Sequence, residues 1–157
     1  MTVSQYNKAV QMLRESDTPI FSPGGSSQLE IDSLEKLLLV KLPASYRAML
    51  AEFGILGFRG KQFYGLGKSG LDGAAVPNVV FATQSSRLSD EISKGMVRIM
   101  ASGYGPDFVI DCGQLDQRGE GPVYEVNELG YRHGMKKVAD SFGEFLLKEV
   151  NTLLENQ

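Results

Sequence analysis

The chain has very few of the side chains that bind metals or form cross-links. Its 157 residues include one cysteine, Cys112, and one histidine, His133. A single cysteine cannot form an internal disulfide, which agrees with a reducing compartment. Zinc sites usually take several Cys and His ligands, and this chain offers one of each. We therefore expect no disulfide, no metal and no cofactor.

Long apolar runs are absent as well. Runs such as residues 37–40 are far shorter than the roughly 20 residues that a membrane-spanning helix needs. The N-terminal region carries polar and charged residues where a signal peptide would have a basic and then an apolar segment: Gln5, Asn7, Lys8 and Arg14. The sequence therefore predicts a cytoplasmic protein that has no membrane partner.

The chain also lacks an excess of positive charge. Its net charge is −3 and its pI is near 5.2. A general nucleic-acid binder needs a basic surface to contact phosphates. Direct binding of nucleic acid is therefore not expected.

What the sequence does contain suits one folded domain. The composition, 42% hydrophobic and 22% charged, is ordinary for a globular protein. A chain of this size can bury about two thirds of its unfolded surface. We see no internal repeat, low-complexity tract or linker, so we expect a single domain over residues 1–157.

Helical patterns dominate the first part of the chain. Apolar spacing predicts a first helix through Tyr6, Val10 and Leu13, and Ser27 with Glu30 has the spacing of a capping box that opens a second. A third helix is predicted from residue 42 to 53, with Pro43 at its first helical position and Gly54 closing its last turn. A further helix opens near Pro77, although residues 79–81 fit a strand equally well.

Strand patterns fill most of the second part. A strand pair turning at Arg59 and Gly60 is followed by short β-rich runs near residues 96–100, 108–110, 123–126 and 135–138. Ser141 and Glu144 form a second capping box before a final amphipathic helix. This order predicts an α+β fold: a mixed, mostly antiparallel sheet with N-terminal helices and a C-terminal helix packed on it.

Two patterns that resemble catalytic motifs fail on context. Residues 65–70 satisfy G-x-G-x-x-G and contain Gly-Lys-Ser, but the segment continues as loop instead of opening a helix, so we interpret it as a flexible loop. Cys112 and His133 could form a nucleophile and base, with Asp111 or Asp116 as the orienting group. However, Cys112 ends an apolar run and His133 lies in a polar turn, so no catalytic set is visible and we do not expect an enzyme.

The charged residues are unevenly distributed. Residues 107–128 contain six acidic residues and one basic residue, Arg118. An acidic surface can attract a cationic partner and accelerate its encounter. Loops and exposed strand faces are also often acidic without any partner, and the composition alone leaves both interpretations open.

Several separate stretches resemble the SUKH superfamily, which contains bacterial immunity proteins and the yeast cell-wall-synthesis regulators. Its N-terminal signature corresponds here to Glu35, Leu38, Leu42, Pro43, Tyr46, Leu50 and Gly54, with Leu39 where glycine is common. Residues 103–111 resemble its glycine-rich turn into a strand that ends in Asp. Residues 121–124 resemble its Gly-Pro-Val-Tyr strand, and residues 139–146 its closing helix. The resemblance implies a SUKH-like domain with its core at residues 27–155.

The resemblance also implies a function. SUKH proteins of this length look like immunity proteins that bind and neutralise a toxin domain, commonly a nuclease. Acidic residues would then meet the toxin's basic surface, with tyrosines as anchors. The candidate partner-binding residues are Tyr104, Asp107, Asp111, Asp116, Glu120, Tyr124 and Glu125. A regulatory interaction module remains the alternative, and we expect a monomer or weak homodimer.

Overall fold

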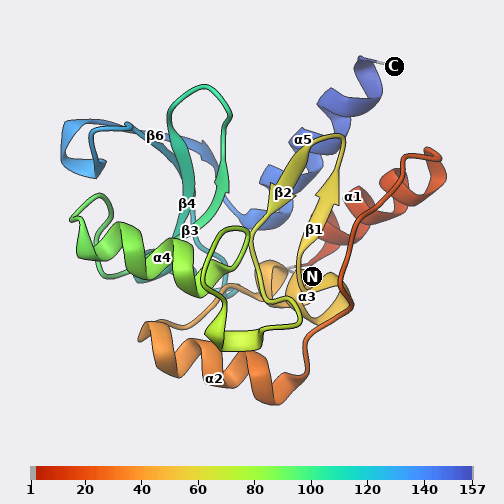
Figure 1. The fold of residues 1–157 in the computed structure, drawn as a ribbon. Coiled ribbons are helices and arrows are strands. Elements are labelled where there is room, and N and C mark those ends of the chain that lie inside the picture. Colours follow the sequence, from red (N-terminus) through yellow and green to blue (C-terminus); the bar gives the residue numbers. More distant parts are fainter. Residues whose placement is uncertain (1–2, 157) are drawn as a thin grey trace.

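The computed structural model describes residues 3–156 (Figure 1). Three helices come first, and the strands follow with one helix among them and one after them, as the sequence predicted. The helices are α1 (Ser4–Glu15), α2 (Gln28–Leu38), α3 (Ala44–Phe53), α4 (Val79–Leu88) and α5 (Phe142–Glu155). The strands are β1 (Leu56–Phe58), β2 (Lys61–Phe63), β3 (Met96–Ala101), β4 (Asp107–Asp111), β5 (Val123–Val126) and β6 (Met135–Ala139). Three short 3-10 turns are η1 (Gly70–Asp72), η2 (Cys112–Gln114) and η3 (Tyr131–His133).

The helix ends follow the predicted chemistry closely. Ser27 and Glu30 form a complete capping box at the start of α2. Asn78 accepts hydrogen bonds from the Val80 and Phe81 amides, which settles residues 79–88 as a helix and not a strand. Pro43 was expected to be the first helical residue, but it is the N-cap of α3, which begins one residue later.

The strands form two antiparallel sheets and not one mixed sheet. β3, β4, β5 and β6 lie in that order, each antiparallel to the next. β1 and β2 form a separate hairpin whose turn residues, Arg59 and Gly60, both have positive φ. The hairpin meets β3 where the Tyr64 amide donates to the Ile99 carbonyl at 2.7 Å. Parallel pairing within residues 3–156 is limited to an isolated bridge between Gly65 and Asn78.

The main core lies between the helices and one face of the four-stranded sheet. Phe145 of α5 packs on Phe108 of β4 with ring centroids 4.9 Å apart, and Phe142 meets the Phe63 ring edge-on. α1 packs alongside α5 (Figure 1). The buried Tyr46 hydroxyl donates to the Tyr64 carbonyl at 2.6 Å, which ties α3 to the end of the hairpin. The chain is therefore a single α+β domain built around one large core.

A second, smaller apolar cluster covers the other face of the sheet. Its buried members are Ile92, Met96, Val109 and Val126. The Tyr131 amide donates to the Glu91 carbonyl, so the turn at η3 and the loop after α4 meet across this face. β4 is therefore buried on both faces, with only Asp107 half-exposed.

Candidate functional site

Tyr104, which the sequence made a candidate site residue, is strongly exposed in the β3–β4 turn. Tyr104 is 68% exposed, and its hydroxyl lies 3.4 Å from Glu125 on β5. A Cβ atom placed on Gly105 would lie 3.0 Å from a Glu128 carboxylate oxygen, so Glu128 lies against the same turn. Partial burial and the neighbouring Glu125 carboxylate raise the pKa of Tyr104. We call Tyr104, Glu125 and Glu128 the acidic tip.

The charge of the acidic tip is largely uncompensated. Neither Glu125 nor Glu128 belongs to an ion pair within the described residues. Lys136 stands opposite Glu125 in the strand register but forms no ion pair with it. Two positive-φ glycines, Gly103 and Gly105, shape the turn that presents Tyr104. The result is an exposed aromatic ring flanked by two carboxylates that no cation pairs with in the part of the chain that the structure describes.

Asp107 lies next to the acidic tip but is already paired. Its carboxylate contacts the Arg98 guanidinium at 3.1 Å. Burial raises the pKa of Asp107, against the opposing effect of Arg98. Tyr124 is half-buried on the opposite face from Glu125 and packs against the smaller apolar cluster. Both residues therefore support the strands more than they present a free surface.

The remaining predicted acids lie at the other end of β4 and serve the fold. Asp111 accepts hydrogen bonds from the Gly113 amide at 3.0 Å and the Gln114 side chain at 2.6 Å, which caps the turn at η2. Asp116 accepts from the Arg118 and Glu120 amides, and the Glu120 amide is the first cause of its lowered pKa. Asp116 thereby shapes an exposed loop turn.

Glu120 is almost completely buried, with 1% exposure. Its two carboxylate oxygens accept from the Ser45 amide at 2.8 Å and the Ser45 hydroxyl at 2.7 Å. Ser45 lies in the first turn of α3, where Pro43 has no side chain that can cap the helix. The Ser45 hydroxyl also accepts from the Gly143 amide at 3.0 Å, which joins α5 to the same network.

The structure thus divides the predicted site in two. Tyr104 and Glu125 come together at one end of the sheet, whereas Asp111, Asp116 and Glu120 lie at its other end. Glu128 was part of the acidic stretch but was not a candidate. Its position beyond β5 could have been suspected from the hairpin register, because β5 pairs back along β4 toward the Tyr104 turn.

The geometry gives no support to Cys112 and His133 as a nucleophile and base. Cys112 follows β4 at one end of the sheet and His133 precedes β6 at the other. Burial raises the pKa of the Cys112 thiol to about 12, which keeps it protonated. Within residues 3–156 no group of three His, Cys, Asp or Glu side chains is arranged to hold a metal ion.

The glycine pattern at residues 65–70 has a packing role. A Cβ on Gly65 would lie 1.7 Å from the Gly54 carbonyl oxygen, and one on Gly54 would lie 2.5 Å from the Gly24 and Leu66 carbonyl oxygens. These glycines allow three backbone segments to cross in close contact. The segment is the loop that the sequence predicted, and of its glycines Gly65 is the one that this crossing needs.

Several of these contacts involve α3 and Gly54, which also carry much of the N-terminal signature described above. A family model described as SMI1-KNR4 cell-wall matches residues 28–146. The chain belongs to the SUKH superfamily. No curated protein matches it. The part of the chain that the structure describes holds no helix long and apolar enough to cross a membrane.

The SUKH signature residues stabilise the fold of this chain through specific contacts. Glu35 accepts a hydrogen bond from the Leu42 amide at 2.7 Å, which holds the loop between α2 and α3. Tyr46 and Gly54 hold the hairpin and the crossing segments through the contacts described above. A Cβ on Gly121, in the stretch that resembles Gly-Pro-Val-Tyr, would lie 2.7 Å from the Asp111 carbonyl oxygen. These signature residues therefore stabilise the scaffold. Tyr104 lies in the glycine-rich stretch of the resemblance, whereas Glu125 and Glu128 lie outside the resembling stretches.

Proposed function

We propose that this SUKH protein is an immunity protein that binds and neutralises a cognate toxin domain. The observation that carries the proposal is the acidic tip: an exposed tyrosine flanked by two carboxylates that form no ion pair within residues 3–156. Tyrosine is favoured at interface anchors, and unpaired carboxylates accelerate association with a basic surface. We propose a nuclease domain of a polymorphic or contact-dependent toxin system, because nucleases carry basic phosphate-binding surfaces.

The proposed mechanism is occlusion. The acidic tip would cover the basic surface on which the toxin holds its nucleic-acid substrate, and the protein itself would need no catalytic group. The complex would form from a monomer or weak homodimer of this chain. Because the contact is electrostatic at its rim, its association rate should fall as salt is raised.

The first test is co-expression with the C-terminal toxin domain encoded by the neighbouring gene. We expect restored growth together with a stable complex that co-purifies. Toxicity that this protein does not relieve, or the lack of a toxic neighbour, would contradict the proposal.

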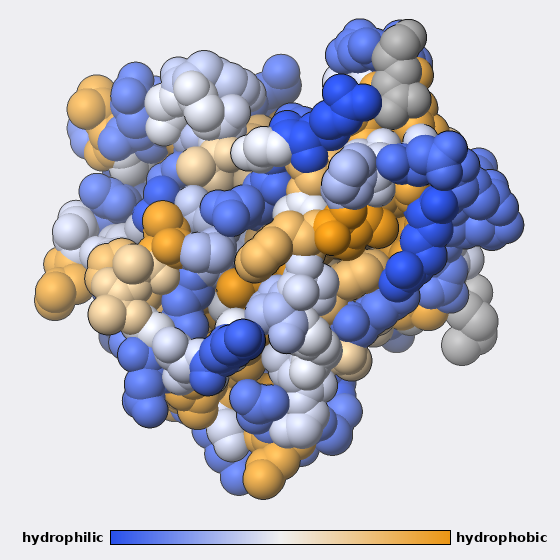
Figure 2. Space-filling view, turned by 45° about the vertical axis from the view of Figure 1, so that its right-hand side comes forward, coloured by the Kyte–Doolittle hydropathy of each residue, from blue (hydrophilic) through white to orange (hydrophobic). Residues whose placement is uncertain are grey.

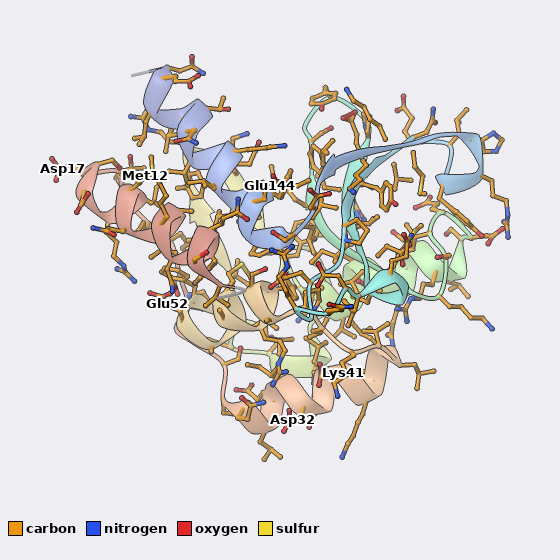
Figure 3. All side chains as sticks on the ribbon, turned by 180° about the vertical axis from the view of Figure 1, so that it is seen from behind. Met12, Asp17, Asp32, Lys41, Glu52 and Glu144 are labelled. Carbon is orange, nitrogen blue, oxygen red and sulfur yellow. The ribbon has the colours of Figure 1, made fainter. Side chains whose placement is uncertain are left out.

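Charge reversal then tests the surface. Glu125→Lys combined with Glu128→Lys should slow association with the toxin by about tenfold or more at low salt. The matched control is Glu15→Lys with Asp32→Lys, two exposed acids on α1 and α2. Figure 3 shows Asp32 on α2, at the opposite end of the view from the β3–β4 turn. Unchanged inhibition by the tip variant would exclude the acidic tip.

A second candidate is a regulatory interaction module of the cell-wall-regulator type. The description of the matching family model, SMI1-KNR4 cell-wall, favours it. Such a module would bind a partner unrelated to toxins and would give no rescue of growth. The co-expression experiment separates the two candidates.

A further inference from the structure

Phe21 pairs with β1 of the β1–β2 hairpin through an isolated bridge, and its side chain is exposed. Its amide donates to the Gly57 carbonyl at 2.8 Å, and the Gly57 amide donates back to the Phe21 carbonyl at 3.0 Å. Pro19 and Pro23 flank this single bridge, and proline cannot extend a ladder of hydrogen bonds. The Phe21 side chain lies over Gly57: a Cβ added to Gly57 would be 3.3 Å from the Phe21 Cβ. Phe21 is nevertheless 56% exposed.

The surface is hollowed on both sides of this ring. One hollow of about 560 Å³ lies along the hairpin turn, and another of about 570 Å³ lies toward Ile55 and Pro77. Phe21 and Gln62 line both hollows. This side of the molecule comes forward in Figure 2, where orange apolar surface runs between blue polar areas. An aromatic ring between two shallow apolar hollows suits the side chains of a docked chain segment.

The charges around the two hollows are of one sign. Arg59 and Lys61 line the first hollow and Lys68 lines the second, and no acidic residue lines either. Lys61 is paired with Glu149 at 2.9 Å. Arg59 and Lys68 are exposed and belong to no ion pair among the residues that the structure describes. In a protein whose net charge is −3, two free cations flank this apolar surface.

We propose that the Phe21 surface, made of Phe21, Gln62, Ile55, Arg59 and Lys68, binds a short segment of a partner protein in which apolar side chains are flanked by Asp or Glu. The apolar side chains fill the hollows beside Phe21, and the carboxylates meet Arg59 and Lys68. The exposed Gln62 amide lies between the hollows and offers both a donor and an acceptor to the segment's main chain. This inference is independent of the proposed immunity function, which uses the other hairpin.

The probe is a capped octapeptide that repeats Asp-Phe-Glu-Leu, titrated into the isotope-labelled full chain while backbone amide NMR signals are followed. We expect shifts at Gly57, Gly60, Gly67 and Lys68. Phe21→Ser and Lys68→Glu should each raise the dissociation constant by about tenfold. Both positions are exposed, so both variants should keep the wild-type spectrum elsewhere. The control Leu88→Ser, at a 90% exposed leucine at the end of α4, should leave binding unchanged.

Two peptide controls and two other ligands complete the test. Replacing the acids by Lys, or the apolar residues by Ser, should abolish the shifts. Equal binding of either control peptide, or shifts confined to other surfaces, would overturn the proposal. Anionic phosphatidylserine vesicles and a DNA duplex provide the remaining arms. Stronger perturbation of the same amides by either would reassign the surface to a membrane or to nucleic acid.

Discussion

Glu120 and Ser45 lie 75 positions apart in the chain and are joined by two hydrogen bonds at the start of α3. The Gly119 carbonyl accepts from the Ala44 amide beside them at 3.0 Å. The loop before β5 thus satisfies two of the free amides at the helix N-terminus. A carboxylate at this end is also favoured by the helix dipole. Glu120, which the sequence made a candidate partner-binding residue, therefore caps a helix in the structure.

Removing this cap should destabilise the protein. We expect Glu120→Ala to lower the free energy of unfolding by about 2–3 kcal/mol, because the buried Ser45 amide and hydroxyl lose their acceptor. Urea denaturation followed by circular dichroism measures the change. Glu125→Ala is the matched control and should cost within about 0.5 kcal/mol, since Glu125 makes one long contact at the surface. Equal losses in the two variants would contradict the capping role.

The same carboxyl group should make stability depend on pH. Burial raises the pKa of Glu120 above its ordinary value of 4.5, against the lowering effect of its Ser45 hydrogen bonds. The folded state therefore binds more protons than the unfolded chain just above that value, and the free energy of unfolding falls as pH rises through this window.

Glu120→Gln isolates this effect, because Asp107, whose pKa burial also raises, is present in both proteins. The free energy of unfolding of the wild type, minus that of the variant, should be greatest below the ordinary glutamate pKa. It should decline to a plateau above the folded-state pKa. Urea titrations from about pH 4 to about pH 7 measure it. A difference that stays constant or grows with pH would show that folding does not raise the pKa of Glu120.

Cys112 should be chemically inert in the folded protein. At a pKa of about 12 the thiolate is scarce near neutral pH. We expect Ellman's reagent to react about a thousandfold more slowly with the native chain than with the same protein in urea. Rapid reaction of the native thiol would restore Cys112 as a candidate nucleophile.

Local signals in the sequence predicted most of the elements. The caps at Ser27 and Ser141, the turn at Arg59 and the apolar spacing of α5 each depend on residues a few positions apart. Such short-range chemistry is readable from one chain. Apolar spacing alone did not distinguish a helix from a strand at the start of residues 79–88. In the structure this segment is a helix, and Asn78 caps it.

The site was less predictable, because it depends on contacts between distant segments. Whether an acid is exposed or buried cannot be read from its neighbours, and Glu120 and Glu125 look alike in the sequence. The sheets are separate because the hairpin meets β3 at the Tyr64 amide, while among residues 3–156 neither β1 nor β2 forms a strand ladder with β3. The smaller apolar cluster forms only because distant loops cover the second face of the sheet.

The crossing of backbones at Gly65 gives the sharpest test of the glycine pattern. A methyl group there would overlap the Gly54 carbonyl oxygen, which cannot move without shifting α3. We expect Gly65→Ala to lower the free energy of unfolding by about 3 kcal/mol or more, measured by thermal and urea denaturation. Gly67→Ala is the matched control. Its Cβ would meet the flexible end of Ile55 at 3.3 Å, so we expect a loss within about 1 kcal/mol. If Gly65→Ala instead folded with wild-type stability, the close packing would not be the reason for this glycine, and a ligand-binding role for residues 65–70 would have to be reconsidered.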